Sequence, residues 1–331
     1  MSVVLTHVTR GGEIESVHRG NLVVVDRSGR IVYSAGDASG YTYWRSAAKP
    51  FQVLPMIEAG GVERFGFSEE EIAVMTSSHG GEERHIDAVG RIFKKMGCGI
   101  DKLDCGAAKP MHPAAARKLL QQNMPYEQVH NPCSGKHSSM IALALIRGYV
   151  VDGYVQPEHP VQKEMLDVVK DVSGIEIESI KIGIDGCGVP VFGLPVYNMA
   201  KAYSLLADPE TAGGSKRRDA LKTVASAMSK NPFYVAGTGR LDTELIEVTN
   251  GRIIAKLGSE GVYCAAVTGA GLGIAIKIED GNYRAIDPVI VELLRRLGLL
   301  TGEELEKLAD RWVVKIKNHH KDVIGEIKAV F

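Results

Sequence analysis

Ser46 and Lys49 are residue types that together could form an activated nucleophile. They lie three positions apart in the segment RSAAKP (residues 45–50), at the start of an apolar run. On a helical turn such positions share a face, so the lysine Nζ could approach the serine Oγ. A serine hydroxyl attacks only when a base takes its proton, and a lysine serves as that base only when burial or nearby cations lower its pKa. Alone, the spacing also fits an N-cap serine and a solvated lysine.

Four further stretches combine polar side chains with glycine. They are SSHGGEE from Ser77, NPCSGKHSS from Asn131, DGCGVP from Asp185 and KLGSEG from Lys256. Glycine lets the backbone approach a ligand closely, so these stretches are candidates for binding. Their ordinary interpretations are a helix cap for Ser78, inert buried thiols for the cysteines and an edge-strand charge for Lys256. The stretch SGKHS lacks the first glycine of a phosphate-binding loop, which disfavours nucleotide binding.

The composition excludes several kinds of partner. The chain has 331 residues, of which 45% are hydrophobic and 24% charged, and its formal net charge is −1. These values are ordinary for a soluble globular protein, without the basic excess that nucleic acid or an anionic membrane attracts. No stretch is apolar for long enough to span a bilayer, and the N-terminal segment does not resemble a secretion signal. We therefore expect a cytoplasmic enzyme that binds neither nucleic acid nor membrane.

The cysteines do not form a disulfide pattern. Five is an odd number, and the residues are widely scattered. This distribution argues against a disulfide framework and leaves buried thiols, catalytic groups or metal ligands as interpretations. The five are Cys98, Cys105, Cys133, Cys187 and Cys264.

Strand-like segments occur at both ends of the chain, with helix-like segments between them. Short β-rich segments separated by turns fill residues 5–34, and the C-terminal third contains an Asn250-Gly251 hairpin signal followed by further strands. Helix-period apolar spacing marks the middle. The predicted helices cover residues 51–59, 82–96, 113–123, 134–148, 157–173, 195–206, 216–228 and 287–297, and the later strands cover 180–184, 253–256, 262–267 and 273–278.

This order predicts an α+β fold in a single domain over residues 1–331. An antiparallel central sheet is built from both terminal segments, about 1–45 and 240–331, and is flanked by helices. A mainly helical region over about 46–230 is inserted between the two halves of the sheet. We find no repeat, low-complexity segment or clear linker.

The polar motifs together resemble those of a known family. RSAAKPFQ, SSHGGE, NPCSGKH, DGCGVP and AKLGSEGV occur in the order and rough spacing of the rhizobial-type, or class 3, L-asparaginases. The resemblance covers most of the chain, from about the first strand past Gly271, and five ordered motifs are far more specific than any one. It implies a fold similar to the serine β-lactamases and glutaminases, hydrolysis of L-asparagine to L-aspartate and ammonia, and a homodimer.

The resemblance also implies two Ser-Lys pairs in one pocket. Ser46 matches the nucleophile, and Lys49 matches its partner. Ser78 and Lys256 match the second pair, which relays protons or orients the first. Amide hydrolysis needs such a set, because a base must take the serine proton and then protonate the departing ammonia. Crowded lysines lower each other's pKa, so one of them can be neutral near pH 7.

A zinc ion is the cofactor that the resemblance implies. The matching ligands are Cys133, Lys136 and Cys187, with water completing the shell. Lysine binds zinc only as the neutral amine, so the affinity should fall as the pH falls. We expect a structural or substrate-orienting ion, because Ser46 already supplies the nucleophile.

Three further positions match substrate-side groups of the family. His137 and Asp185 match neighbours of the zinc site, with Asp185 a candidate partner for the substrate's α-amino group. Arg45 is a candidate for the α-carboxylate or for the electrostatics of Lys49. The segment 237–243 lies where substrate contacts are expected but has no confident match, and asparagine and glutamine differ by one methylene. The preference between the two substrates therefore stays open.

Two other functions share some of these features. Ser-x-x-Lys is also the signature of penicillin-recognising serine acyltransferases and β-lactamases. These enzymes usually act outside the cytoplasm and carry a Lys-Thr-Gly strand, which Lys256-Leu257-Gly258 only approximates. A non-catalytic amino-acid-binding or zinc-stabilised protein would also use polar clusters, although two Ser-Lys pairs give it little advantage.

Overall fold

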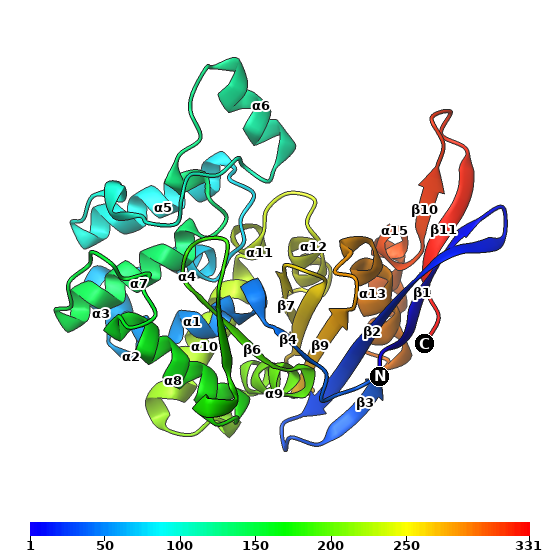
Figure 1. Ribbon diagram of the computed structural model, residues 1–331, viewed down its shortest axis with the longest axis horizontal. Helices are drawn as coiled ribbons and strands as arrows, with labels where there is room; N and C mark the ends of the chain where they lie inside the picture. Colours follow the sequence, from blue (N-terminus) through cyan, green and yellow to red (C-terminus); the bar gives the residue numbers. More distant parts are fainter.

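Strands from both ends of the chain form one antiparallel sheet, as predicted. The computed structural model describes all residues, Met1–Phe331. Figure 1 shows the terminal strands side by side at one end of the molecule, where both termini lie. In spatial order the sheet contains β10 (Val314–Lys317), β11 (Val323–Ala329), β1 (Val3–Arg10), β2 (Glu13–Asp26), β9 (Leu272–Ile278), β8 (Val262–Val267) and β7 (Ile253–Gly258), and β3 (Ile31–Ala35) also pairs with β2.

A second, smaller sheet carries the chain into the predicted site. Its strand order is β4-β6-β5, and both pairings are antiparallel. The expected strand over residues 180–184 is β5, whereas the other two strands were not predicted. Their bounds are Tyr41–Tyr43 for β4, Pro190–Pro195 for β6 and Lys181–Ile184 for β5.

The middle of the chain is helical, and the predicted helices are present. Glycines in the left-handed conformation end several of them, for example Gly97 and Gly148, because glycine adopts that conformation without strain. The helices up to the last strands of the large sheet are α1 (Lys49–Gln52), α2 (Leu54–Glu58), α3 (Gly61–Phe65), α4 (Glu69–Met75), α5 (Glu83–Met96), α6 (Pro113–Gln121), α7 (Ser134–Arg147), α8 (Pro160–Ser173), α9 (Val196–Ala207), α10 (Ser215–Lys230), α11 (Pro232–Val235) and α12 (Leu241–Val248). The C-terminal helices are α13 (Ile286–Arg296), α14 (Gly302–Lys307) and α15 (Ala309–Trp312).

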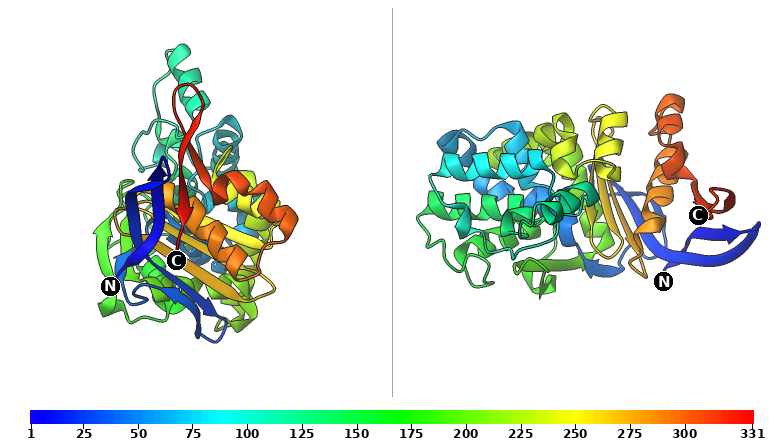
Figure 2. Two further views of the ribbon diagram at one scale, coloured as in Figure 1. Left: turned by 90° about the vertical axis from the view of Figure 1, so that its right-hand side faces the viewer. Right: turned by 90° about the horizontal axis from the view of Figure 1, so that it is seen from above.

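The large sheet separates two hydrophobic cores. Alternate residues of a strand point to opposite faces, so Cys264 of β8 joins one core and its neighbour Tyr263 joins the other. Helix α9 packs on the face towards the helical region, and α13 packs on the opposite face. Figure 2, seen from above, shows the sheet standing between the helical region and the C-terminal helices. Burial on both faces explains why every residue of β8 is apolar and buried.

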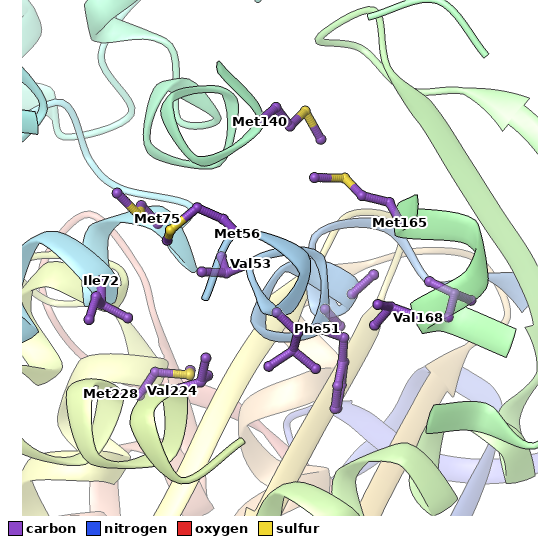
Figure 3. Close-up of a cluster of buried hydrophobic side chains, with 14 of the residues drawn as sticks. Phe51, Val53, Met56, Ile72, Met75, Met140, Met165, Val168, Val224 and Met228 are labelled. Carbon is purple, nitrogen blue, oxygen red and sulfur yellow. The ribbon is translucent and has the colours of Figure 1, made fainter. Parts of the chain in front are cut away.

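The core of the helical region brings together side chains from six helices. Figure 3 shows Phe51 of α1 near Val168 of α8, with methionines filling the spaces between other helices. Methionine suits such irregular spaces because its side chain is flexible. This packing fixes α1 from several sides, and α1 carries Lys49.

Two details of the C-terminal third differ from the sequence prediction. Asn250-Gly251 is not a hairpin, because α12 occupies the preceding residues and the turn leads from this helix into β7. Both residues have positive φ, as an Asn-Gly hairpin turn also requires, so the local signal was the same. The final hairpin of β10 and β11 was not predicted.

None of the helices is long and apolar enough to cross a membrane.

Candidate active site

A cavity of about 240 Å³ lies where the helical region meets the end of the large sheet. Six of the ten predicted site residues line it, and they come from segments far apart in the sequence. The other four, Lys49, Lys136, His137 and Lys256, are buried and do not line the cavity. The lining residues are Arg45, Ser46, Ser78, Cys133, Asp185 and Cys187.

Ser46 lies just after a strained residue. The short 3-10 helix η1 (Arg45–Ala48) leads directly into α1, and its first residue, Arg45, has a φ of 54°. A non-glycine residue in the left-handed region costs free energy, and such strain gathers at functional sites. Ser46 is half-buried, lines the cavity and makes no hydrogen bond through its hydroxyl within the chain. This hydroxyl is therefore free to approach a ligand.

Lys49 is bonded to Ser78 rather than to Ser46. Its fully buried Nζ donates hydrogen bonds to the Ser77 carbonyl at 2.6 Å, to Ser78 Oγ at 3.0 Å and to the Pro132 carbonyl at 3.3 Å. The expected hydrogen bond between Lys49 Nζ and Ser46 Oγ is not formed, because these three acceptors occupy the ammonium. Lys49 thus ties α1 to the residues that follow α4 and to the loop that precedes α7.

Lys256 approaches the same hydroxyl from the sheet. It shares its face of β7 with Ile254, towards the helical region, and its side chain is 0% exposed. Its Nζ donates to Ser78 Oγ at 3.1 Å and to the Leu257 carbonyl at 2.8 Å. Burial lowers the pKa of Lys256 to about 7; Lys49 and Arg240 act in the same direction, and the Asp242 carboxylate opposes them. Lys256 is therefore the lysine that can be neutral near pH 7.

The burial of Lys256 is expected to lower the free energy of unfolding by an amount that depends on pH. Between pH 7 and 10.5 the unfolded chain holds a proton on Lys256 that the folded chain lacks, so folding becomes more favourable as the pH rises. We expect Lys256→Met to be stabilised relative to the wild type, and this advantage to shrink by up to ~1.4 kcal/mol per pH unit over that range. Urea unfolding of both proteins at several pH values measures the difference. An advantage that does not change with pH would contradict the lowered pKa.

Two thiols and a lysine meet on another side of the cavity. Lys136 Nζ lies 3.2 Å from Cys187 Sγ, and the Cys187 thiol donates a hydrogen bond to Cys133. This hydrogen bond, together with Lys49 and Lys136, holds the pKa of Cys133 well below its usual value, whereas the pKa of Cys187 is raised. The sulfurs also raise the pKa of Lys136, against the opposing effect of its burial. Cys133 is therefore the more acidic of the two thiols in this cluster.

These three side chains are the only arrangement near the cavity that suits the expected zinc ion. No group of three or more His, Cys, Asp or Glu side chains that could hold a metal ion is present. A zinc site therefore requires Lys136 as the third ligand beside Cys133 and Cys187. The donor set fits zinc, because thiolates are preferred ligands and Cys187 Sγ already lies 3.2 Å from the amine. Lys136 must lose its proton to bind.

Close backbone packing positions this cluster. A side chain at Gly135 would collide with the Val74 carbonyl, so only glycine lets the start of α7 approach the end of α4. The amide of Asn131 supports the preceding loop, since its Oδ1 accepts the Cys133 N–H at 2.8 Å and its Nδ2 donates to the Cys105 carbonyl at 2.8 Å. The NPCSGKH motif is thus held against the segment that carries Ser78.

The predicted substrate-side residues differ in where they lie. Asp185 and Arg45 line the cavity and form an ion pair, with Arg45 Nη2 2.9 Å from Asp185 Oδ1. Lys136 and Arg45 lower the pKa of Asp185 despite its burial. His137 is buried away from the cavity, and its Nδ1 lies 2.7 Å from the Tyr154 hydroxyl. His137 therefore supports the wall rather than facing a ligand.

Two further cavity residues had no role assigned from the sequence, although one of them, Arg240, lies in the segment 237–243, where substrate contacts were expected. Arg240 lines the cavity half-buried, forms no ion pair, and makes its one side-chain hydrogen bond to Met111 Sδ, at 3.8 Å. Tyr283 lines the same cavity from the start of a 3-10 helix, η6 (Tyr283–Ala285). The sequence signal for Arg240 was its position beside Gly237 and Gly239, which indicate a tight loop. In the structure both glycines have positive φ, and the loop leads into α12. No signal marked Tyr283.

Comparisons with solved structures find similar folds at low sequence identity. A structure described as Mglu in its native form in 4.3 M NaCl is 16% identical with a TM-score of 0.45, covering 87% of this chain and 63% of that chain. The chain thus spans less than two thirds of the length of that protein. A putative β-lactamase from Bacteroides dorei is 12% identical with a TM-score of 0.43, covering 83% of this chain and 93% of its own. A β-lactamase from Mycobacterium bovis is 12% identical with a TM-score of 0.42, covering 85% and 95%.

Comparison with protein families gives a more specific result. None of the curated protein sequences matches the chain significantly. The family described as L-asparaginase II matches residues 6–329, which is nearly the whole chain and includes every residue of the candidate site. The chain therefore belongs to the L-asparaginase II family of amidohydrolases.

Proposed function

We propose that the protein hydrolyses the side-chain amide of L-asparagine to L-aspartate and ammonia, with Ser46 as the nucleophile. The observation that carries this proposal is the pairing of two serines in one cavity. Ser46 has a free hydroxyl, whereas Ser78 Oγ accepts hydrogen bonds from two buried lysines. Family membership supports the substrate class. A free hydroxyl that shares a cavity with a lysine-bonded hydroxyl suits acyl transfer, in which one group attacks and the other moves the proton.

The proposed reaction has two halves. Ser46 Oγ attacks the amide carbon, and its proton passes to Ser78, whose own proton moves to neutral Lys256 Nζ. The tetrahedral intermediate collapses, the C–N bond breaks, and the proton returns along the same route to the departing ammonia. Water then attacks the aspartyl ester on Ser46 with the same groups as base and acid, and L-aspartate leaves. Lys49 holds Ser78 in place through its hydrogen bond of 3.0 Å.

The zwitterionic end of the substrate would bind to charged groups on the cavity wall. Asp185 accepts the α-amino group, as its ionised carboxylate lines the cavity. Arg240 binds the α-carboxylate, because its guanidinium faces the cavity without a carboxylate partner. Arg45 is already paired with Asp185, so its main role is to hold that carboxylate in position.

Removing the charge of Arg240 should weaken substrate binding more than it slows the chemical step. A hydrogen bond to a charged group contributes about 1.5–3 kcal/mol, so Arg240→Gln is expected to raise KM for asparagine about 10- to 100-fold with kcat changed little. Steady-state ammonia release measures both constants. Arg284→Gln is the matched control, because Arg284 lies outside this cavity. An unchanged KM in Arg240→Gln would assign the α-carboxylate to another group.

Zinc belongs to this proposal through Cys133, Lys136 and Cys187. A zinc ion bound there would supply positive charge at the cavity wall and would cross-link the start of α7 to the turn between β5 and β6. The residues themselves keep the two segments together in its absence, through the contact of 3.2 Å between Lys136 Nζ and Cys187 Sγ.

An ammonia-release assay with asparagine and glutamine in parallel, each with and without a chelator, tests the proposal. We expect release from asparagine, and slower release from glutamine only if the cavity discriminates its extra methylene, a difference of about 1–3 kcal/mol. Loss of activity after chelation, restored by zinc, would support the metal site. No ammonia from either amide would reject the proposed function.

A further inference from the structure

We propose that Asp242 is a positioning residue of the reaction, whose buried carboxylate holds Lys256 against Ser78 and keeps this lysine available as the base. This inference rests on the proposed function. It concerns the segment 237–243, for which the sequence offered no assignment.

The fold places Asp242 behind the active site. It lies in the first turn of α12, and its side chain is only 2% exposed. The loop before it is closed by a hydrogen bond of 3.2 Å from the Gly237 N–H to Thr243 Oγ1. A carboxylate at this place benefits from the positive end of the helix dipole, which partly offsets the cost of burial.

One oxygen of Asp242 contacts both the backbone and the side chain at the end of β7. Its Oδ2 accepts the Leu257 N–H at 2.9 Å and lies 3.6 Å from Lys256 Nζ. Lys256 Nζ in turn donates to Ser78 Oγ at 3.1 Å. Asp242, Lys256 and Ser78 thus form a series of contacts that leads from a buried carboxylate to the cavity. The arrangement is similar to a carboxylate that orients a catalytic base.

The charge balance around Lys256 makes this carboxylate important. Lys256 has no exposed surface, so water cannot stabilise its ammonium form. The cations near it favour loss of the proton, and Asp242 is the carboxylate that favours its retention. Without Asp242, Lys256 would be neutral over a wider pH range but too weak a base to take the proton that the serine hydroxyls release. The other titratable groups that face this pair are Lys49, Arg240, Cys133, Cys264, Tyr203, Tyr263 and Asp287.

The titration of Lys256 tests this inference without requiring turnover. Protein labelled with 13C at lysine Cε is titrated by NMR, and the Lys256 signal is assigned by its loss in Lys256→Arg. We expect a midpoint near pH 7 in the wild type, and a midpoint lower by about one pH unit or more in Asp242→Asn. Asp242→Glu should restore the wild-type value, and Glu244→Gln, two residues along the same helix, should leave it unchanged.

Kinetics provide the second readout. The acid limb of the kcat/KM profile should move with the Lys256 midpoint in Asp242→Asn, and kcat should fall about 10- to 100-fold with KM almost unchanged. Asp242→Ser replaces Asp242→Asn if the latter does not fold. An unchanged Lys256 midpoint in the uncharged variant, or an equal change in Glu244→Gln, overturns the inference. Failure of the wild type to release ammonia would instead reject the proposed function. The NMR titration would still decide whether Asp242 controls the midpoint of Lys256, because it requires no turnover.

Discussion

Ser46→Ala is expected to lower kcat for asparagine by about 10³-fold or more while the fold stays intact. The nucleophile forms the covalent bond, so no other group in the cavity can replace it. The hydroxyl makes no hydrogen bond within the chain, and its removal therefore leaves no buried group without a partner. Ammonia release measures kcat, and thermal unfolding checks the fold.

A third serine in the same cavity provides the control. Ser259 also lines the cavity but is bonded to neither lysine. Ser259→Ala should keep kcat within a few-fold of the wild type. If Ser46→Ala retained most of its turnover while Ser78→Ala lost it, Ser78 would be the nucleophile and the two serine roles would be exchanged.

Lys49→Met is expected to lower kcat by about 10²-fold or more. Methionine is similar in length but cannot donate, so Ser78 Oγ would lose the hydrogen bond of 3.0 Å that fixes it, and the carbonyls of Ser77 and Pro132 would lose their donor. Each buried acceptor left unpaired costs about 1–3 kcal/mol, so the melting temperature should fall unless the removed charge compensates. Steady-state kinetics and thermal unfolding measure the two effects.

Lys94→Met controls for the loss of a lysine, because Lys94 is exposed on α5 and forms no ion pair. It should change neither kcat nor stability measurably. Wild-type kcat in a folded Lys49→Met protein would remove Lys49 from the mechanism and would leave Lys256 as the one lysine that serves Ser78.

The alternation of strands and helices was readable from the sequence because it depends on local periodicity. The strand over 262–267 and the helix over 134–148 appear in the structure almost as predicted, as β8 and α7. The hairpin of β10 and β11 was missed because β10 is the edge strand, β11 is its neighbour, and most residues of both strands are partly or fully exposed, so their apolar alternation is weak. Asn250-Gly251 misled the prediction because the same backbone conformation serves a helix-to-strand turn.

The site was predictable as a set of motifs but not as a geometry. Glycine-rich junctions identified the segments that carry Ser78, Cys133 and Asp185, and these three side chains do line one cavity. The spacing of Ser46 and Lys49 suggested a direct hydrogen bond, yet Nζ bonds to acceptors that come from elsewhere in the chain. A long side chain such as that of lysine can reach many acceptors. The spacing of two residues in the sequence therefore does not determine which acceptor the Nζ atom bonds to.

Other features depend on long-range packing and had no local signal. Asp242, in the first turn of α12, contacts Lys256 and Leu257, which follow it by 14 and 15 residues, and no sequence motif covered it. His137 was predicted from the family resemblance as a neighbour of the zinc site; its Nδ1 lies 2.7 Å from the Tyr154 hydroxyl, a contact that the sequence did not indicate, and its part in substrate binding stays a prediction. The homodimer and the cytoplasmic location stay predictions.

Identification of the acylated serine tests the central claim most directly. Protein that is turning over labelled L-asparagine is quenched in acid, digested and analysed by mass spectrometry. We predict an aspartyl ester on the peptide that contains Ser46, and none on that peptide in Ser46→Ala. An aspartyl ester on Ser78 in the wild type would contradict the assignment of the nucleophile.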